Sequence, residues 1–245
     1  MTTKIFTFLS LFLLFSLGLA AQKNVTNQNL YWLRYYNQLS LNSKLVWHNE
    51  IEDRRFFEHN RQHHLIIHSR LHYKFFPNAD VAFGLTYSLQ SPQDPNATIN
   101  VVVPEKRIVQ EFNLSNSLSK RLTFQQRLRI DERFIHKNNG KELLDGYDFN
   151  FRFRYRLQAS YRVNKLEAPK ATILKLSNEL MVNAGKNIIY NQFDQNRLYV
   201  GIEQGFGKGI SAELGYLHWY QQRASGNQFF DRDIIRFTLN HKIKL

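Results

Sequence analysis

The sequence predicts an all-β fold, a single antiparallel transmembrane β-barrel of about ten strands, with twelve as the alternative count. Three observations predict it: an apolar segment at the N-terminus, long segments in which apolar and polar residues alternate, and connections that alternate between short turns and longer polar loops. Hydrophobic residues make up 43% of the 245 residues, too many for an intrinsically disordered chain. The chain contains no cysteine, which excludes disulfides and thiolate chemistry.

Residues 1–20 have the plan of a secretory signal peptide. Lys4 is their only charge, residues 5–17 are almost wholly apolar, and Gly18 and Ala20 are the small residues expected before a cleavage site. An uncleaved membrane anchor is the alternative, but the apolar stretch is short for about 30 Å of hydrocarbon. We therefore predict a signal peptide at 1–20 and a barrel domain at 21–245. Export to a bacterial envelope is favoured over a eukaryotic secretory route, because small eukaryotic secreted domains often rely on disulfides and this chain has no cysteine.

The clearest strand lies between Tyr147 and Tyr161. Its odd-numbered positions are aromatic or aliphatic, and its even-numbered positions are Asp, Asn, Arg, Gln and Ser. In a β-strand, alternate residues point to opposite faces, whereas a helix would distribute both sets around its axis. Residues 44–56, 61–76, 80–91 and 120–135 repeat the pattern, and weaker copies occupy residues 103–118, 170–183, 193–206, 209–222 and 231–245.

Residues 29–41 are an eleventh candidate strand. Bacterial single-chain barrels have even strand numbers, so we predict ten strands from Lys44 to Leu245. The candidate at 29–41 is then left over, to lie in the lumen or the periplasm, or to pair with a further strand in a twelve-stranded barrel. This parity argument excludes a closed wall of eleven strands with the two termini at opposite ends.

The connections support the same architecture. Short turns are expected at 41–43, 77–79, 115–117 and 207–209, and longer polar loops at 91–102, 136–146, 184–192 and 223–230. Short periplasmic turns and longer extracellular loops are typical of outer-membrane barrels. The segment Gly205–Gly209 is a hairpin turn rather than a phosphate-binding loop, because Gly follows Lys208 where that motif needs Ser or Thr.

A soluble periplasmic β protein would also alternate, with its apolar face inside. Strand length favours the membrane, since a tilted crossing needs about 9–11 residues. Aromatic residues near strand ends also favour it, as an interface girdle would. The residues expected in this girdle are Tyr31, Trp32, Tyr35, Tyr36, Phe75, Phe76, Trp219 and Tyr220.

The polar face is predicted to line the lumen. Placing Arg152, Arg154 and Arg156 against lipid would cost about 2–4 kcal/mol for each one near the bilayer midplane. Phe151, Phe153 and Tyr155 are therefore expected to face lipid. The predicted lumen charge network comprises Glu50, Glu52, Arg54, Arg70, Glu111, Arg127, Arg129, Asp131, Arg133, Arg152, Arg154, Arg156, Glu179, Arg197 and Glu203.

Two functions suit such a lumen: a structural or ligand-sensing barrel braced by ion pairs, or a small pore that prefers anions. No metal or cofactor is expected, because His64, His68 and His72 stand about 13 Å apart along one strand. No His-x-Ser or Ser-x-His pair occurs, so we predict that the protein is not an enzyme, a lipid-modifying activity being the alternative. The expected partners are outer-membrane lipid and a small anionic solute.

The net charge of +13 does not indicate nucleic acid as a partner, because the arginines alternate with acids on one face and the chain is exported. We expect a monomer.

Several of these features together resemble a known family. They are Glu50 before Arg54, Glu111, the pairs Arg127-x-Arg129 and Arg152-x-Arg154-x-Arg156, Glu179, and the segment Phe193–Leu198 with Asn196-Arg197. The chain is similar to the uncharacterised outer-membrane barrels of Bacteroidetes and some proteobacteria, domain of unknown function family twenty-four-ninety. The resemblance implies the fold and an outer-membrane location for nearly the whole mature chain, and it implies no activity.

Overall fold

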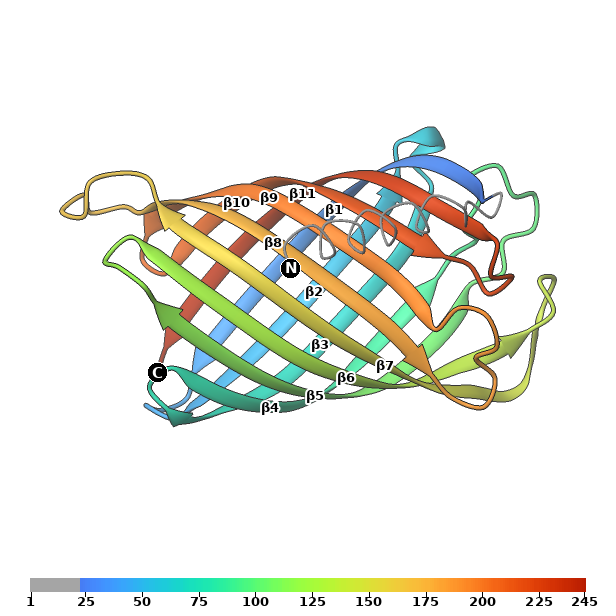
Figure 1. Ribbon diagram of the computed structural model, residues 1–245, viewed down its shortest axis with the longest axis horizontal. Helices are drawn as coiled ribbons and strands as arrows, with labels where there is room; N and C mark the ends of the chain where they lie inside the picture. Colours follow the sequence, from blue (N-terminus) through green and yellow to red (C-terminus); the bar gives the residue numbers. More distant parts are fainter. Residues whose placement is uncertain (1–22) are drawn as a thin grey trace, which may run out of the picture.

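The computed structural model describes residues 23–245, so the predicted signal peptide lies outside the described residues. The chain forms a closed barrel of tilted strands (Figure 1). The eleven strands are β1 (Asn24–Ser40), β2 (Leu45–Phe56), β3 (Gln62–Phe76), β4 (Ala79–Gln90), β5 (Val103–Ser117), β6 (Leu122–Asn138), β7 (Leu143–Arg162), β8 (Thr172–Ala184), β9 (Phe193–Gly207), β10 (Ile210–Gln222) and β11 (Gln228–Lys244). Within the described residues, no helix is long and apolar enough to cross a membrane.

The all-β barrel is confirmed, but the parity argument is wrong. The leftover segment at 29–41 belongs to β1, which is a full strand of the wall. β1 pairs with β2 antiparallel and with β11 in parallel, from Asn24 opposite Gln228 to Ser40 opposite Lys244. Even parity follows only when the first and last strands run antiparallel. Here the parallel pairing of β1 with β11 provides hydrogen-bond partners for both edge strands although the number of strands is odd. The first strand therefore begins at the end of the barrel opposite the C-terminus (Figure 1).

The connections divide into two sets at the two ends. The end that we call the turn end carries residues 41–44, 77–78, 118–121 and 208–209, together with a longer connection at 163–171 that the sequence analysis did not predict. The end that we call the loop end carries residues 57–61, which include the 3₁₀ turn η1 (Glu58–Asn60), and residues 91–102, 139–142, 185–192 and 223–227.

Two predicted connections are corrected. The loop expected at 136–146 is only 139–142, because β6 and β7 continue their pairing beyond the predicted strand ends. The turn expected at 115–117 is strand, and the chain turns at 118–121 instead. The predicted hairpin at Gly207–Gly209 is confirmed, and Gly207, Lys208 and Gly209 all have positive φ, as a tight turn with this twist requires.

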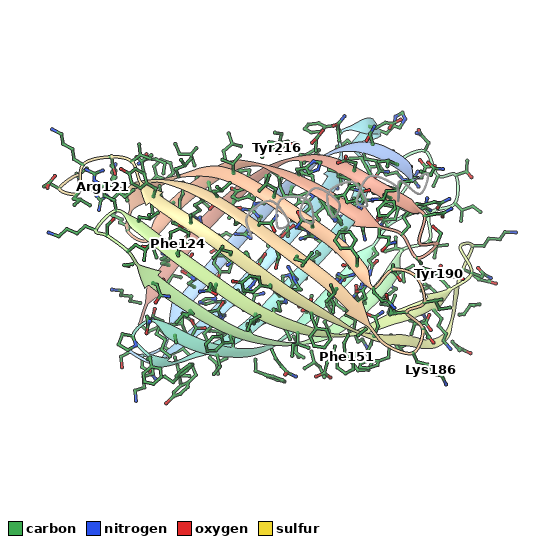
Figure 2. The ribbon with its side chains drawn as sticks, viewed as in Figure 1. Arg121, Phe124, Phe151, Lys186, Tyr190 and Tyr216 are labelled. Atoms are coloured by element: carbon green, nitrogen blue, oxygen red, sulfur yellow. The ribbon has the colours of Figure 1, made fainter. Side chains whose placement is uncertain are left out.

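The two faces of the wall have opposite chemistry. Phe153 and Tyr155 are exposed on the outside, whereas Arg152 is buried on the lumen side of β7. Phe151 and Tyr216 project outward from the barrel, and Arg121 and Lys186 lie at its opposite ends (Figure 2). Large apolar side chains are exposed outside all around the wall, Phe83 and Leu85 by 60% each. The predicted inward orientation of the β7 arginines is confirmed.

The predicted aromatic girdle needs a correction. Tyr31 and Trp32 are neighbours on one strand, so only one of them can face outward, and Trp32 is the buried one. Trp219 is likewise buried, and Tyr36 lines the lumen. With Leu30, Phe56, Tyr199, Leu217 and Ile234, the two tryptophans form a small apolar cluster inside the barrel. Tyr35, Phe75 and Phe76 are exposed as predicted.

Candidate functional site in the lumen

The lumen contains two cavities. One, at the loop end, has a volume of about 540 Å³, and the other, at the turn end, has a volume of about 570 Å³. Both cavities are lined by the same eight charged residues, which therefore mark the level where the cavities meet. They are Arg34, Glu50, Arg70, Arg127, Arg156, Glu179, Arg197 and Arg236.

A chain of ion pairs crosses this level, starting on β1. Glu50 of β2 accepts contacts from Arg34 at 3.5 Å and from Arg70 of β3 at 3.1 Å. Arg70 also reaches Glu111 of β5, at 3.5 Å. This second contact passes over β4, so the side chain of Arg70 ties together strands that are not neighbours.

The chain continues across β6, β7 and β8. Glu111 contacts Arg129 at 3.2 Å, and Arg127 crosses β7 to reach Glu179 at 2.5 Å. Arg154 contacts Glu179 at 3.0 Å and Asp131 at 3.4 Å. We call this network the central belt; it consists of Arg34, Glu50, Arg70, Glu111, Arg127, Arg129, Asp131, Arg154 and Glu179. Charge-assisted pairs of this kind fix the geometry of the side chains that make them.

A glycine makes the crossing over β4 feasible. Gly84 lies directly opposite Arg70 in the β3–β4 pair. A Cβ atom at this position would overlap the Ser69 carbonyl oxygen and the Cα and Cγ atoms of Arg70. The inward residues that flank it on β4, Ala82, Thr86 and Ser88, are also small. Because the side chains on this part of the inner face of β4 are short, Arg70 of β3 has room to extend across β4 to Glu111 of β5.

Further ion pairs lie outside the belt. Arg54 pairs with Glu52 at 2.5 Å, Arg152 pairs with Asp194 at 2.8 Å, and Arg133 and Arg107 share Glu105 at 2.5 and 2.7 Å. Toward the turn end, Lys175 contacts Glu203 and Glu213, and Arg236 contacts Glu213 at 2.8 Å. The arrangement braces the wall on both sides of the belt.

All fifteen residues of the predicted charge network lie in the lumen. Thirteen of them form ion pairs, whereas Arg156 and Arg197 have no carboxylate within ion-pairing distance among the described residues. Five further charged residues line the lumen without having been predicted to do so: Arg34, Glu105, Asp194, Arg232 and Arg236. The sequence pattern of β11 is ambiguous, because charged residues occur on both of its faces. Asp231 and Asp233 lie on the outer face, and Arg232 and Arg236 lie on the inner face.

Arginines stack on the two buried tryptophans near the loop end. The rings of Trp32 and Trp219 meet edge to face, 5.8 Å apart. The guanidinium of Arg54 lies 3.8 Å from the Trp32 ring centroid, and that of Arg197 lies 4.6 Å from the Trp219 centroid. Each contact is favourable for a cation over an aromatic face. The indole nitrogens of both tryptophans are buried and have no hydrogen-bond partner.

Arg232 is held by amides instead of a carboxylate. It donates to the side-chain oxygens of Gln28, Gln221 and Gln93 at 2.7, 2.7 and 2.9 Å. Gln93 belongs to the 91–102 loop, and Gln28 also donates to its backbone oxygen at 2.7 Å. The longest loop therefore reaches into the mouth of the barrel and is fastened there.

The described residues offer no metal centre, since no three His, Asp or Glu side chains are grouped as ligands. His68 and Thr86 are hydrogen-bonded at 2.5 Å, and His72 and Asp80 at 2.7 Å. Both histidines are buried in the lumen wall. The histidines thus join the polar lining.

A family model described as "Protein of unknown function (DUF2490)" matches residues 29–230. Among curated proteins, none matches the sequence significantly. The fold is similar to the β domain of the Bordetella autotransporter BrkA, with 9% identity, 80% of this chain and 81% of that chain covered, and a TM-score of 0.43. It is also similar to the siderophore receptor PirA from Pseudomonas aeruginosa, with 13% identity and a TM-score of 0.29, over 76% of this chain and 35% of the receptor.

Proposed function

The chain belongs to the DUF2490 family of unknown function, and we propose that it is an outer-membrane barrel whose lumen receives a small anionic solute at the loop end. The charge of the loop-end cavity carries this proposal. Of the described residues, 13 arginines and five acidic residues line it. Glu105, Glu111 and Asp131 lie behind these arginines and neutralise only part of the charge.

The outer surface supports the membrane location. Soluble monomers rarely expose apolar patches larger than a few hundred Å². Here the outer wall carries exposed Phe, Leu, Ile and Tyr on every strand, and the inside is filled with charge. A soluble lipocalin-like barrel would have the reverse arrangement. Membrane fractionation and heat-modifiable gel migration test the location, and recovery in the periplasm without detergent would contradict it.

The belt supports a receptor more than an open channel. Its ion pairs join non-adjacent strands at the level where the two cavities meet, so the lumen is crowded by charged side chains there. A solute that enters from the loop end would meet cationic walls and stop at the belt. We propose a structural and ligand-sensing role on this basis.

Equilibrium dialysis tests whether the barrel binds small anions in preference to a cation. The purified barrel in detergent is dialysed against radiolabelled inorganic phosphate, acetate or choline at low ionic strength, where electrostatic attraction is least screened. We expect retention of at least one anion and none of the cation choline. Equal retention of anions and choline, or retention of none of them, would contradict the proposed function.

A small anion-preferring pore is the second candidate. Arg156 and Arg197 line both cavities, so they are cations along any route between them. Planar-bilayer recording separates the two functions. Steady anion-selective conductance that falls in an Arg154→Glu variant favours the pore, whereas no conductance above the bare bilayer favours the receptor.

We propose no catalytic activity. The hydroxyl–imidazole pair of Thr86 and His68 resembles an activated nucleophile, and His68 lines the loop-end cavity, but no carboxylate of the described residues is hydrogen-bonded to the other ring nitrogen of His68 to orient it. Lipase or acyltransferase turnover by the purified protein would overturn this proposal.

A further inference from the structure

We propose that the junction between the two cavities is a binding site for a phosphate dianion, held by Arg156 and Arg197. This inference rests on the proposed function and assigns both the kind of anion and the residues that bind it. It concerns the two arginines of the predicted charge network that make no ion pair.

The register of the wall brings these two arginines to one level. Glu179 of β8 lies directly opposite Arg156 of β7 on one side and opposite Arg197 of β9 on the other. Neighbouring strands are about 4.8 Å apart, so the two arginine backbones stand about 10 Å apart. Both arginines line both cavities, so a ligand at the junction lies beside Arg197, and the long side chain of Arg156, which makes no ion pair, can extend to it.

The charges at this level do not balance. Glu179 is already engaged by Arg127 at 2.5 Å and by Arg154 at 3.0 Å. No carboxylate of the described chain pairs with Arg156 or Arg197. A phosphate monoester carries about −1.5 to −2 charges at pH 7, which matches two uncompensated guanidiniums. A carboxylate would match only one of them, so the charge favours phosphate.

Two hydrogen-bond donors without a partner belong to Arg156 and to the residue opposite Arg197. Trp219 lies directly opposite Arg197, and its indole nitrogen is buried without an acceptor, as is the Nε atom of Arg156. Buried polar groups are nearly always hydrogen-bonded in folded proteins. The oxygens of a phosphate would supply the acceptors that this region lacks.

Aromatic stacking holds one of the two arginines in place. The Arg197 guanidinium lies 4.6 Å from the Trp219 ring and 5.3 Å from the Trp32 ring, and its Nε atom donates to Gln195 at 2.9 Å. The terminal nitrogens of the guanidinium are left for a ligand. The adjoining cavity of about 540 Å³ accommodates the organic part of a monoester.

Tryptophan fluorescence tests the site. The chain has three tryptophans, and Trp47 faces outward, so a Trp47→Phe background leaves only the two in the lumen. We expect inorganic phosphate to change the emission saturably. Arg156→Gln and Arg197→Gln should each weaken binding at least about tenfold, since hydrogen bonds to charged groups are lost. Arg55→Gln, on the outer face, should leave the affinity unchanged.

Two further arms complete the design. Arg156→Lys and Arg197→Lys keep the charge and should retain more affinity than the Gln variants, an effect that general misfolding would not produce. Binding of glycerol 3-phosphate or of dihexanoyl phosphatidic acid through the same arginines supports the site and identifies the source, a soluble ester or a lipid headgroup. If the Gln variants bind phosphate as tightly as Arg55→Gln does, the site is wrong. If dialysis still shows anion retention in that case, the proposed function survives.

Discussion

The phenol ring of Tyr199 lies over Gly201, two residues farther along β9, so closely that a Cβ atom on this glycine would overlap the hydroxyl oxygen. Gly215, which is directly opposite Gly201 on β10, lies under the same ring. The hydroxyl then donates to Glu213 at 2.5 Å, which also holds Arg236. The two glycines therefore allow the Tyr199 ring to pack flat against the inner wall, with its hydroxyl hydrogen-bonded to the carboxylate of the Glu213–Arg236 ion pair.

The first prediction follows from this packing. Gly201→Ala should destabilise the barrel by about 1–3 kcal/mol, because the added methyl group forces the ring out of its seat. Urea unfolding in micelles, followed by gel migration, measures the loss. In a Tyr199→Ala background the same substitution should cost much less. An equal cost in both backgrounds would show that the ring is not the cause.

The second prediction concerns the belt. Glu179→Gln removes the carboxylate that Arg127 and Arg154 share and leaves them only the longer contacts with Glu111 at 3.9 Å and Asp131 at 3.4 Å. Removing one partner of a buried pair costs about 3–5 kcal/mol. Glu203→Gln is the matched control, because among the described residues Glu203 forms an ion pair with Lys175 alone, accepts a hydrogen bond from Ser211, and is less buried than Glu179. We expect a clearly lower unfolding midpoint for Glu179→Gln than for Glu203→Gln. Equal midpoints would contradict a stabilising role for the belt.

The alternation of residue types predicted which residues face the lumen, but not how they pair. The period-two pattern of β7 assigns Arg152, Arg154 and Arg156 to one face, because a one-residue shift would exchange every side chain. The contacts of Arg127 with Glu179 and of Arg70 with Glu111 cross an intervening strand. Such contacts depend on the register between strands, which a single sequence does not reveal, and the Arg70 contact also needs the small inward residues of β4.

The strand count failed for a different reason. The segment at 29–41 has the composition of a strand, and only the parity rule excluded it from the wall. The parallel β1–β11 seam is a long-range pairing with no local turn to signal it. Similarly, the aromatic residues Trp32 and Trp219 indicated strands but not which face of the wall each side chain lies on. Tyr31 and Trp32 are adjacent and both aromatic, so the pattern did not show that Trp32 is the one facing the lumen.

The third prediction compares two neighbours on β7. Phe153→Arg should impair assembly much more than Arg154→Gln does. Phe153 is exposed on the apolar outer face, where a charge near the bilayer midplane costs about 2–4 kcal/mol. Loss of Arg154 leaves Glu179 paired with Arg127 and Asp131 paired with Arg129. The fraction of heat-modifiable protein in the outer membrane measures assembly, and the reverse order would contradict the orientation of β7.

The last prediction uses the parallel seam to fix topology. With eleven strands, Lys23 lies at the loop end and Leu245 at the turn end, whereas a ten-stranded barrel starting at Lys44 would begin and end at the turn end. If the turn end faces the periplasm, the start of β1 is displayed outside the cell. The chain has no cysteine, so single Cys substitutions give a clean signal.

On intact cells, a membrane-impermeant thiol reagent should label Lys23→Cys and Lys186→Cys but not Lys208→Cys, while all three should react after lysis. Labelling of Lys208→Cys with protection of Lys186→Cys would invert the barrel. Labelling of Lys186→Cys with protection of Lys23→Cys would contradict the seam, because both residues lie beyond strand ends at the same end of the wall.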